Sequence, residues 1–381
     1  MIKKNILHIV AVSFSINYFF GNQFVYLKKN GNKYHLGCSP SQDFNKLSKE
    51  LDFIPFEVEI SREITPLKDI RAILQTYKYI KRNKIDKVVG HTPKGGMIAM
   101  IASFLAGVSE RIYFRHGLVY ETSSGFKRVL LKNIERLTGV LATRVVCVSN
   151  GIKEISEKDK LNNFKKNLVL GLGTCSGIDI ENKYNPNSYD LQNIKELKRK
   201  LNIKDDDFVV GFVGRLVKDK GIDELILAWD ILKENHKNIK LLLIGPIEER
   251  DAISDYSKAK ILNEPSIRFT DFILDASIYY CLMDVFILPS YREGFPTVAL
   301  EASAMSVPVL ISKATGCTEA IIENKTGFFI THDPIDIASK ITYYMQNEEI
   351  CVSHGNNGRS FVVENFEQTK VWDLIDKVLK I

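Results

Sequence analysis

The sequence lacks the features of several common classes of protein. It contains no run of 18 apolar residues, and its first residues, Met1 to Val10, include no small-residue cleavage site, so we expect neither a membrane-spanning helix nor a signal peptide. The six cysteines form no CxxC pair, and the seven histidines are scattered. This usage predicts reduced thiols, no zinc site and a cytoplasmic location.

The glycine motifs of two nucleotide-binding classes are also missing. A Rossmann dehydrogenase needs GxGxxG after its first strand, but the segment Ser13 to Asn17 that follows this strand has no glycine. Residues 214–221 resemble a phosphate-binding loop without matching the Walker A pattern GxxxxGK[ST]. The acidic triplet Asp205 to Asp207 precedes a predicted strand, whereas metal ligands for a sugar nucleotide should follow one. We therefore interpret the triplet as a solvated turn and do not expect hydride transfer.

Acidic residues are scarce in the first half of the chain. Residues 1–180 contain 28 Lys and Arg against 15 Asp and Glu, a net charge of +13, whereas residues 181–381 carry −7, which together give the overall +6. A basic half indicates an anionic partner such as membrane lipid or a phosphorylated acceptor. Aromatic residues do not alternate with the basic ones, and no nucleic-acid-binding module is recognisable, so we do not expect nucleic acid as the partner.

Both halves alternate short apolar runs with helical patterns such as 222–234, which is typical of α/β folds with a doubly wound parallel sheet. The candidate strands are Ile6–Val12, Tyr34–Cys38, Val58–Ile60, Lys87–Val89, Arg111–Phe114, Val145–Val148, Val209–Val213, Leu241–Ile244, Ile267–Phe269, Val285–Leu288, Val307–Ile311 and Phe328–Ile330. We expect two α/β domains, at residues 1–180 and 181–365, joined by an Asn-, Gly- and Pro-rich linker at residues 177–187. The hydrophobic spacing of residues 366–381 predicts a final amphipathic helix.

The stretch around Glu293 carries the strongest signal for a ligand site. An apolar run before it predicts a buried strand, and Pro296 suits the first position of a helix. The amides of Thr297 and Val298 would then be unpaired at the positive end of the helix dipole, which favours an anion. Glu293 at the mouth of this site, and Glu301 one to two turns inside the helix, suggest contacts with the sugar and the ribose of a sugar nucleotide. From these residues alone, an ordinary strand, loop and helix with two solvated glutamates is an equal alternative.

A second loop follows the predicted strand Val209–Val213. It contains Arg215, whose guanidinium offers a planar fork of donors, and Lys220, whose ammonium is a compact charge. Either cation alone would be interpreted as a solvated loop charge. Their shared position after a strand end, in the same half of the chain as Glu293, predicts that they bind a diphosphate.

In the first half of the chain, polar residues follow two predicted strands. Arg115 and His116 come directly after one strand, at the end where parallel α/β folds make ligand contacts. His91 holds the equivalent place after the preceding strand, and Lys94 and Gly95 would suit an acceptor phosphate. A structural histidine and a simple turn are the alternatives at these two places.

Together these motifs resemble the retaining glycosyltransferases of family 4, which have the GT-B fold. The resemblance rests on Glu293 and Glu301 with seven residues between them, the surrounding REGFPTVALE, the GRLxKDKG of residues 214–221 and the RHG that begins at Arg115. It implies two Rossmann-like domains that face each other across a cleft, the first binding the acceptor and the second the nucleotide sugar, with the last helix packing back on the first. One departure is the missing Gly-Gly pair that many relatives carry after the first strand.

The resemblance also implies roles for individual residues, in a reaction without a metal or other cofactor. The residues expected to act in catalysis are Glu293, His116, Arg215 and Lys220. The residues expected to bind the donor are Gly214, Arg215, Lys220, Glu293, Gly294, Phe295, Pro296, Thr297, Val298 and Glu301. The residues expected to bind the acceptor are His91, Lys94, Gly95, Arg115 and His116.

We therefore expect a bacterial enzyme of capsule, O-antigen or lipid-linked glycan synthesis. It would move a hexose or N-acetylhexosamine from a nucleotide sugar, with UDP as the expected nucleotide, to a lipid-diphosphate-linked saccharide at the inner face of the membrane. A predicted helix at residues 127–137 has Arg128, Lys132 and Arg136 on one side, which would suit anionic lipid or, equally, a core-facing helix with a solvated basic face. A nucleotide-sugar epimerase or a phosphorylase of the same fold, and a non-catalytic sugar-nucleotide-binding subunit, are the alternatives.

Overall fold

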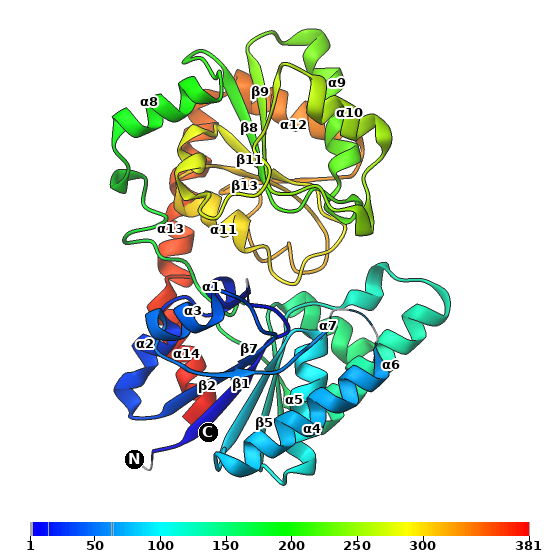
Figure 1. Cartoon of the computed structure of the whole chain (residues 1–381). Coiled ribbons are helices and arrows are strands. Elements are labelled where there is room, and N and C mark those ends of the chain that lie inside the picture. The colour runs from blue at the N-terminus through cyan, green and yellow to red at the C-terminus, as the bar shows by residue number, and fades with distance from the viewer. Residues whose placement is uncertain (1–2, 14, 62, 64, 381) are drawn as a thin grey trace. The chain divides into compact units, whose positions relative to one another are not determined.

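The chain forms two compact units. The computed structural model describes residues 3–13, 15–61, 63 and 65–380 (Figure 1). Phe14, inside the segment 13–17 discussed above, and Ile381, at the end of the predicted last helix, lie outside the described residues. The first unit comprises Met1–Gly177 and Thr369–Ile381, and the second comprises Ile178–Gln368. We call them the first and the second domain.

The first domain contains a parallel sheet of seven strands in the order β3-β2-β1-β4-β5-β6-β7. The strands are β1 (Asn5–Ile9), β2 (Lys33–Cys38), β3 (Ile54–Glu57), β4 (Lys87–His91), β5 (Glu110–Arg115), β6 (Arg144–Cys147) and β7 (Asn167–Val169). The helices of this domain are α1 (Ser15–Phe19), α2 (Gln23–Leu27), α3 (Phe44–Glu50), α4 (Pro66–Arg82), α5 (Pro93–Leu105), α6 (Gly125–Leu141), α7 (Asn150–Lys158) and α14 (Gln368–Lys380).

The second domain contains a parallel sheet of six strands in the order β10-β9-β8-β11-β12-β13. The strands are β8 (Phe208–Val213), β9 (Ile239–Ile244), β10 (Ile267–Phe269), β11 (Val285–Leu288), β12 (Val309–Ser312) and β13 (Gly327–Ile330). The helices are α8 (Leu191–Lys200), α9 (Ile222–Asn235), α10 (Asp255–Asn263), α11 (Thr297–Ala304), α12 (Pro334–Gln346) and α13 (Glu348–Asn365).

The predicted fold class, two doubly wound α/β domains, is confirmed. Central strands such as β9 and β11 are almost entirely buried, which explains their continuous apolar runs. Two edge strands differ from the prediction: β3 lies at Ile54–Glu57 instead of 58–60, and β7 was not predicted. β3 is largely exposed and β7 is half-buried along its length, so their hydrophobic pattern is weak.

Each sheet has a point at which the strand order reverses. In the first domain this point lies between β1 and β4, and in the second between β8 and β11. Loops that leave neighbouring strands in opposite directions open a crevice there, and doubly wound folds bind ligands at this place. The loop that carries Lys220 follows β8, and the loop that carries Glu293 follows β11. The two predicted donor loops therefore border the same reversal point.

The last helix, α14, packs in the core of the first domain. Trp372 and Ile375 of α14 belong to the same buried cluster as residues of β1, β4 and α2. The end of the helix is held by Lys87, the first residue of β4, whose fully buried Nζ donates to the carbonyl of Leu379 at 2.5 Å. Arg144 donates to the carbonyl of Val378 at 3.4 Å. These donors satisfy carbonyls that a helix end otherwise leaves unpaired.

No helix among the described residues is both long and apolar enough to cross a membrane.

The Lys87 contact predicts a loss of stability when the amine is removed. Lys87→Met keeps most of the side-chain volume but leaves the buried Leu379 carbonyl without its donor, so the free energy of unfolding should fall by about 1–3 kcal/mol. Urea unfolding followed by circular dichroism measures the change. Lys377→Ala, on the exposed side of α14, is the matched control and should stay within about 0.5 kcal/mol of wild type. Equal stability of the two variants would contradict the assigned role of Lys87.

Candidate functional site

Two loops of the second domain are joined where β8 and β11 end. The amide of Tyr291 donates to the carbonyl of Asp219 at 3.0 Å, and Nη2 of Arg292 lies 2.7 Å from Oδ2 of the same Asp219. Gly221 adopts a φ of +70°, and a Cβ at this position would come within 2.1 Å of the carbonyl oxygen of Pro289. Only glycine therefore lets the start of α9 approach the second loop this closely.

Lys220 and Glu293 form an ion pair across these two loops. Nζ of Lys220 donates to Oε1 of Glu293, and Oγ of Ser290 donates to the same oxygen at 2.8 Å. Both charged side chains are mostly buried, with 16% and 13% of their surface exposed. The structure thus brings together two of the predicted catalytic residues, 73 positions apart in the sequence.

A third loop, after β12, supports the backbone at Glu293. The amide of Glu293 donates to the carbonyl of Thr315 at 3.0 Å. Gly316 has a φ of +77°, and a Cβ there would lie 2.2 Å from the carbonyl oxygen of Gly294. The predicted donor residues Glu293 and Gly294 are therefore fixed by contacts from the loop after β12, which the sequence did not indicate.

Arg215 is paired with a different carboxylate. Its Nη1 is 2.7 Å from Oε2 of Glu248, and half of its side-chain surface is exposed. The preceding Gly214 donates its amide to the carbonyl of Ile244 at 2.9 Å. The two cations that were predicted to bind the diphosphate are thus both paired with carboxylates.

The start of α11 differs from the prediction in two ways. The helix begins at Thr297 and Pro296 is its N-cap, so the proline precedes the first helical position. The amide of Thr297 was expected to be unpaired, but it donates to the carbonyl of Phe295 at 3.0 Å, which makes that prediction wrong. The amide of Thr297 is therefore used in a tight turn at residues 295–297. Phe295 is buried, with its ring 5.5 Å from that of Phe366, and Val298 is half-buried.

Glu301 lies inside α11, as expected, and is largely buried. The hydroxyl of Tyr280 donates to its Oε2 at 2.8 Å. Burial raises the pKa of the Glu301 carboxyl, and hydrogen bonds from Tyr280 and Tyr184 oppose this rise. The carboxylate that the family resemblance assigns to ribose therefore already has tyrosine hydroxyls as partners.

In the first domain, His91 and His116 lie together. His91 ends β4 and is buried, whereas His116 follows β5 and is half-buried. Nδ1 of His91 lies 3.1 Å from Nε2 of His116. His8, on β1, extends the contact, with its Nδ1 3.1 Å from Nε2 of His91. The sequence placed His8 in a strand but did not assign it to the site.

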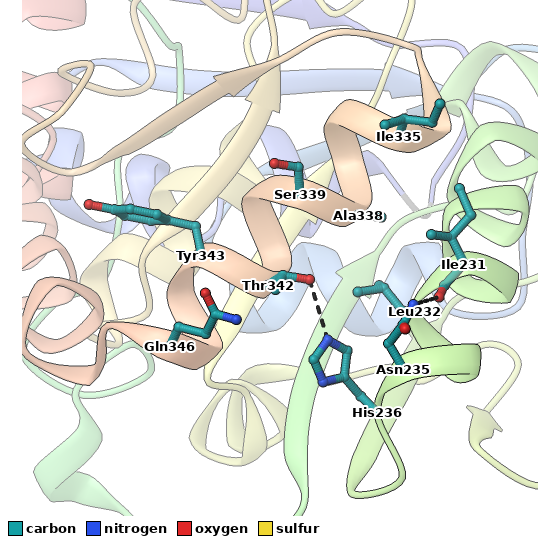
Figure 2. Close-up of a pocket in the computed structure, with 10 residues that line it drawn as sticks. All are labelled: Ile231, Leu232, Asn235, His236, Ile335, Ala338, Ser339, Thr342, Tyr343 and Gln346. Atoms are coloured by element: carbon teal, nitrogen blue, oxygen red, sulfur yellow. Dashed lines mark hydrogen bonds between the residues drawn. The ribbon is translucent and has the colours of Figure 1, made fainter.

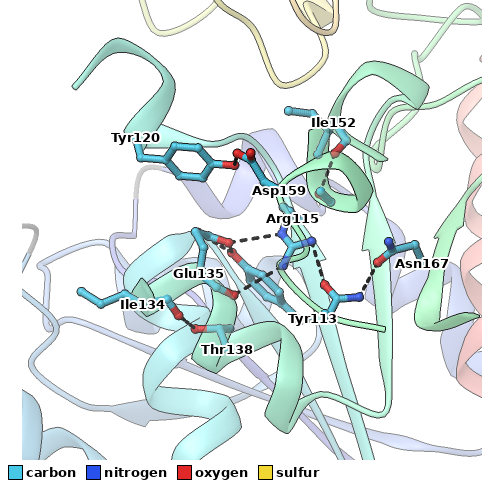
Figure 3. Close-up of polar contacts among 11 residues, drawn as sticks. Tyr113, Arg115, Tyr120, Ile134, Glu135, Thr138, Ile152, Asp159 and Asn167 are labelled. Carbon is cyan, nitrogen blue, oxygen red and sulfur yellow. Dashed lines mark hydrogen bonds and ion pairs between the residues drawn. The ribbon is translucent and has the colours of Figure 1, made fainter. Parts of the chain in front are cut away.

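Arg115, which was expected to bind the acceptor, is a buried structural residue. Its side chain is completely buried, Nε lies 3.2 Å from Oε2 of Glu135 on α6, and Nη1 donates to Oδ1 of Asn162 at 3.1 Å (Figure 3). The hydroxyl of Tyr113 donates to the same carboxylate at 3.0 Å. The prediction overlooked that the last residue of a strand alternates in direction with its neighbours, so Arg115 and His116 point to opposite faces of the sheet.

Lys94 and Gly95 occupy the first turn of α5 rather than a simple turn. Nζ of Lys94 lies 2.7 Å from Oδ2 of Asp69, and the side chain is mostly buried. A Cβ on Gly95 would come within 3.2 Å of the carbonyl oxygen of Ile9, so this position packs against the end of β1. Thr92, just before the helix, has a φ of +62°, an uncommon value for a residue with a side chain.

The basic residues predicted on one side of residues 127–137 contact other parts of the domain, although Arg128 and Arg136 also remain exposed. Nη1 of Arg128 donates to backbone carbonyls of the preceding turn at 3.1 Å, Nζ of Lys132 lies 2.8 Å from Oδ1 of Asp159, and Arg136 donates to carbonyls that follow α7. The exposed residues of α6 include the polar Lys127, Arg128, Asn133 and Arg136, and also four apolar residues that we call the apolar side of α6: Phe126, Val129, Leu137 and Val140.

Two further features of the second domain are an acidic turn and a surface hollow. The carboxylates of Asp205, Asp206 and Asp207 contact Lys198, Asn238 and the amide of Lys204 in the turn before β8. A surface hollow of about 380 Å³ lies between α9 and α12 (Figure 2). His236 and Thr342 line it, 3.5 Å apart, and none of the predicted site residues does.

Several residues around the Lys220–Glu293 pair were not predicted. Arg292 and Asp219 adjoin predicted residues in the same two motifs, so the sequence could have indicated that they belong to the site. The ring of His332 stacks on Tyr291 at 3.8 Å and 3°, and it comes from the loop after β13. No local pattern in the sequence connects His332 with that loop.

Comparison with known proteins identifies the type of enzyme. Residues 193–361 match the family model described as "Glycosyl transferases group 1", and residues 7–149 match "Glycosyl transferase 4-like". The chain is 31% identical over 379 residues to the capsular polysaccharide biosynthesis glycosyltransferase CapM of Staphylococcus aureus, covering 99% of this chain and 97% of CapM. It is 27% identical over 341 residues to the UDP-Gal:alpha-D-GlcNAc-diphosphoundecaprenol alpha-1,3-galactosyltransferase of Escherichia coli, covering 88% and 85%.

Among solved structures, the Anabaena protein HepE in complex with UDP-glucose superimposes with a TM-score of 0.82. The match covers 99% of both chains at 18% sequence identity. This likeness identifies the fold as GT-B, in agreement with the expectation from the motifs.

Because Arg115 is paired with Glu135 in the interior, its replacement should lower the free energy of unfolding. Replacement of a residue that only binds substrate would leave stability unchanged. Arg115→Met leaves the Glu135 carboxylate buried without its cation, and the free energy of unfolding should fall by about 3–5 kcal/mol. Arg115→Met combined with Glu135→Leu should recover part of the loss, because it removes the unpaired charge. Denaturant unfolding measures both. Arg71→Met, at an exposed position on α4, is the control; if Arg115→Met were as stable as this control, the structural assignment would be wrong.

Proposed function

The chain belongs to glycosyltransferase family 4, and we propose that it moves a hexose or N-acetylhexosamine from a UDP-sugar to a lipid-diphosphate-linked saccharide with retention of configuration. The observation that carries the proposal is the meeting of Lys220 and Glu293 at the reversal point of the second domain. These are the residues that the family motifs assign to the diphosphate and to the donor sugar. Two relatives add support, since CapM is named for capsular polysaccharide synthesis and the Escherichia coli enzyme is named for transfer from UDP-Gal.

In the proposed complex, the diphosphate exchanges with the carboxylates that hold the two cations. Lys220 leaves Glu293 and binds a phosphate oxygen, and Arg215 leaves Glu248 to bind another. Glu293 then accepts hydrogen bonds from the donor sugar, and Glu301 accepts them from the ribose. The positive end of α11 adds to the field that favours the diphosphate.

The proposed reaction takes place on one face of the sugar. The acceptor hydroxyl oxygen forms a bond to C1 on the side from which the diphosphate leaves. The C1–oxygen bond to the diphosphate breaks, its electron pair stays on the diphosphate, and a diphosphate oxygen takes the hydroxyl proton. Lys220 and Arg215 stabilise the charge that develops on the leaving group, which preorganised cations do effectively in a site with little water. His116 contributes a contact to the substrate.

The proposed acceptor places the first domain at a membrane. The lipid-linked diphosphate in the name of the Escherichia coli relative is an acceptor of this kind. The first domain is the basic half of the chain, and α4 and α6 expose apolar side chains to solvent. Leu67 is 84% exposed and Phe126 81% exposed, beside the exposed cations Arg71 and Lys127. Neighbouring apolar and cationic groups of this kind match the interior and the headgroups of an anionic leaflet.

Removal of the Lys220 ammonium should abolish most of the transfer. Lys220→Ala should lower kcat by about 10²–10³-fold, because the leaving diphosphate loses a fixed cation. Radiolabelled UDP-glucose, UDP-galactose, UDP-N-acetylglucosamine and UDP-N-acetylgalactosamine, tested against a lipid-diphosphate-linked sugar, measure transfer. Lys218→Ala, an exposed cation of the same loop, is the matched control and should stay within about twofold of wild type.

The same assay separates the alternatives. Rates that are unchanged in Lys220→Ala would exclude the assigned role, and conversion of a UDP-sugar without acceptor would indicate an epimerase. Chelation with EDTA should leave the rate unchanged, because the proposal assigns charge neutralisation to side chains.

The apolar side of α6 should determine binding to membranes. Wild-type protein should float with vesicles rich in phosphatidylglycerol at low salt, and Phe126→Glu combined with Val129→Glu should reduce the bound fraction at least about tenfold. Each apolar side chain contributes about 1.5–3 kcal/mol when it is buried, and the added charges are repelled by the lipid. Leu191→Glu, on the exposed side of α8, is the control. Absence of flotation by wild type, or equal flotation of both variants, would count against this surface.

A further inference from the structure

Three histidines and a cysteine form a continuous chain of polar contacts inside the first domain. Nδ1 of His8 lies 3.1 Å from Nε2 of His91, and Nδ1 of His91 lies 3.1 Å from Nε2 of His116. Nδ1 of His116 lies 3.4 Å from Sγ of Cys175, in the segment that follows β7. At the other end, Nε2 of His8 is buried and has no hydrogen-bond partner among the described residues.

The topology of the sheet builds this chain. β1, β4 and β5 are neighbours at the point where the strand order reverses. The register aligns His8 with Val89 and His91 with Phe114. Each next histidine is therefore two residues further along on the next strand, and side chains two residues apart point to the same face. The three rings form one diagonal row across three strands.

Aromatic rings hold the row in place. Phe19 stacks on His116 with ring centroids 4.2 Å apart. Phe20 and Phe24 meet His8 edge-on, at 5.5 and 5.1 Å. This packing fixes the planes of the imidazoles and keeps water from the inner end of the row. The rotation that would break the contacts between ring nitrogens is therefore hindered.

The imidazoles are neutral, so their protons must all point the same way. Burial lowers the pKa of His8 and of His116 to about 3, and it lowers the pKa of His91 well below its ordinary value. A neutral imidazole has one N–H donor and one acceptor nitrogen. When one ring of the row donates its N–H towards His8, the other rings must donate in the same direction.

The thiol determines the direction. Burial raises the pKa of Cys175 to about 12, so the thiol keeps its proton. An imidazole nitrogen is a good acceptor and a thiol sulfur is a weak one, which favours donation from Sγ–H of Cys175 to Nδ1 of His116. His116 then donates from Nε2 to His91, and His91 donates from Nε2 to His8. The remaining N–H of His8, at Nε2, has no hydrogen-bond partner among the described residues.

We propose that His8 and His91 are positioning residues that hold His116 in its Nε2–H tautomer, so that Nδ1 is an acceptor for a substrate hydroxyl. The thiol of Cys175 takes the place of that hydroxyl before substrate binds. The inference rests on the proposed function, in which His116 contacts the substrate. Because the row ends at a nitrogen without a polar partner among the described residues, a proton received at His116 has no path onwards. The row fixes a direction and does not conduct protons.

Nitrogen NMR of the histidine rings tests the proposal without any substrate. Protein labelled with ¹⁵N-histidine should show His116 with a protonated Nε2 and an unprotonated Nδ1, assigned by the signals lost in His116→Gln. His91→Leu should move the Nδ1 signal towards the protonated position, because Nε2 has lost its acceptor. His91→Asn offers an amide oxygen close to the position of Nδ1 and should restore the wild-type spectrum. His8→Leu is a second variant in case His91→Leu does not fold.

Activity provides the second readout. His91→Leu should lower kcat/KM at least tenfold, and His91→Asn should stay within about threefold of wild type. His35→Leu, a buried histidine of β2 whose Nδ1 contacts Tyr79 at 2.9 Å, is the matched control and should change neither readout. A protonated Nδ1 in wild-type His116, or a spectrum that His91→Leu and His8→Leu leave unchanged, would overturn the proposal. Failure of wild type to transfer sugar would instead refute the proposed function, because the spectra do not depend on turnover.

Discussion

The ion pair between Lys220 and Glu293 is the interaction on which the proposed site depends. It joins two loops that leave the sheet at the reversal point, and both charges are largely removed from water. A buried charge is costly when its partner leaves, so each side chain needs a replacement partner when the pair opens. In the proposed complex, a nucleoside diphosphate alone would supply an anion to Lys220 and leave Glu293 without a cation, with the hydroxyl of Ser290 as its remaining partner. A nucleotide sugar would supply an anion to the lysine and hydroxyl donors to the glutamate. On this proposal, the pair would favour the complete donor over the nucleoside diphosphate alone.

The two domains use polar residues at strand ends in different ways. In the second domain they lie in loops, and the cations are paired with carboxylates that an anion can replace. In the first domain they lie against the sheet: Arg115 is fixed by Glu135, and His91 is enclosed by aromatic rings. In the proposed reaction, the first domain would therefore contribute side chains fixed by their packing, whereas the second would contribute side chains that exchange partners. This division suits an acceptor that must be positioned and a donor that must be activated.

Much of the fold was readable from the sequence, because central parallel strands are apolar throughout and their order along the chain is regular. The motifs also placed Lys220 and Glu293 in one site before the structure joined them. Arg115 was misjudged because its position after a strand says nothing about the partner that α6 supplies, and Glu135 is 20 residues away. His8 was overlooked because a histidine inside an apolar strand has no local signal of its neighbours on β4. The edge strands β3 and β7 are hard to predict because their partial exposure weakens the apolar pattern that marks a strand.

The most direct test of the central claim compares the binding of UDP and of the UDP-sugar that the enzyme turns over, by calorimetry, to wild type and to Glu293→Ala. If the pair must open for the donor, removal of the carboxylate frees Lys220 for the diphosphate. Glu293→Ala should then bind UDP at least as tightly as wild type does, and should lose the additional affinity that the sugar provides. A variant that loses affinity for UDP and for the UDP-sugar by the same factor would contradict the account.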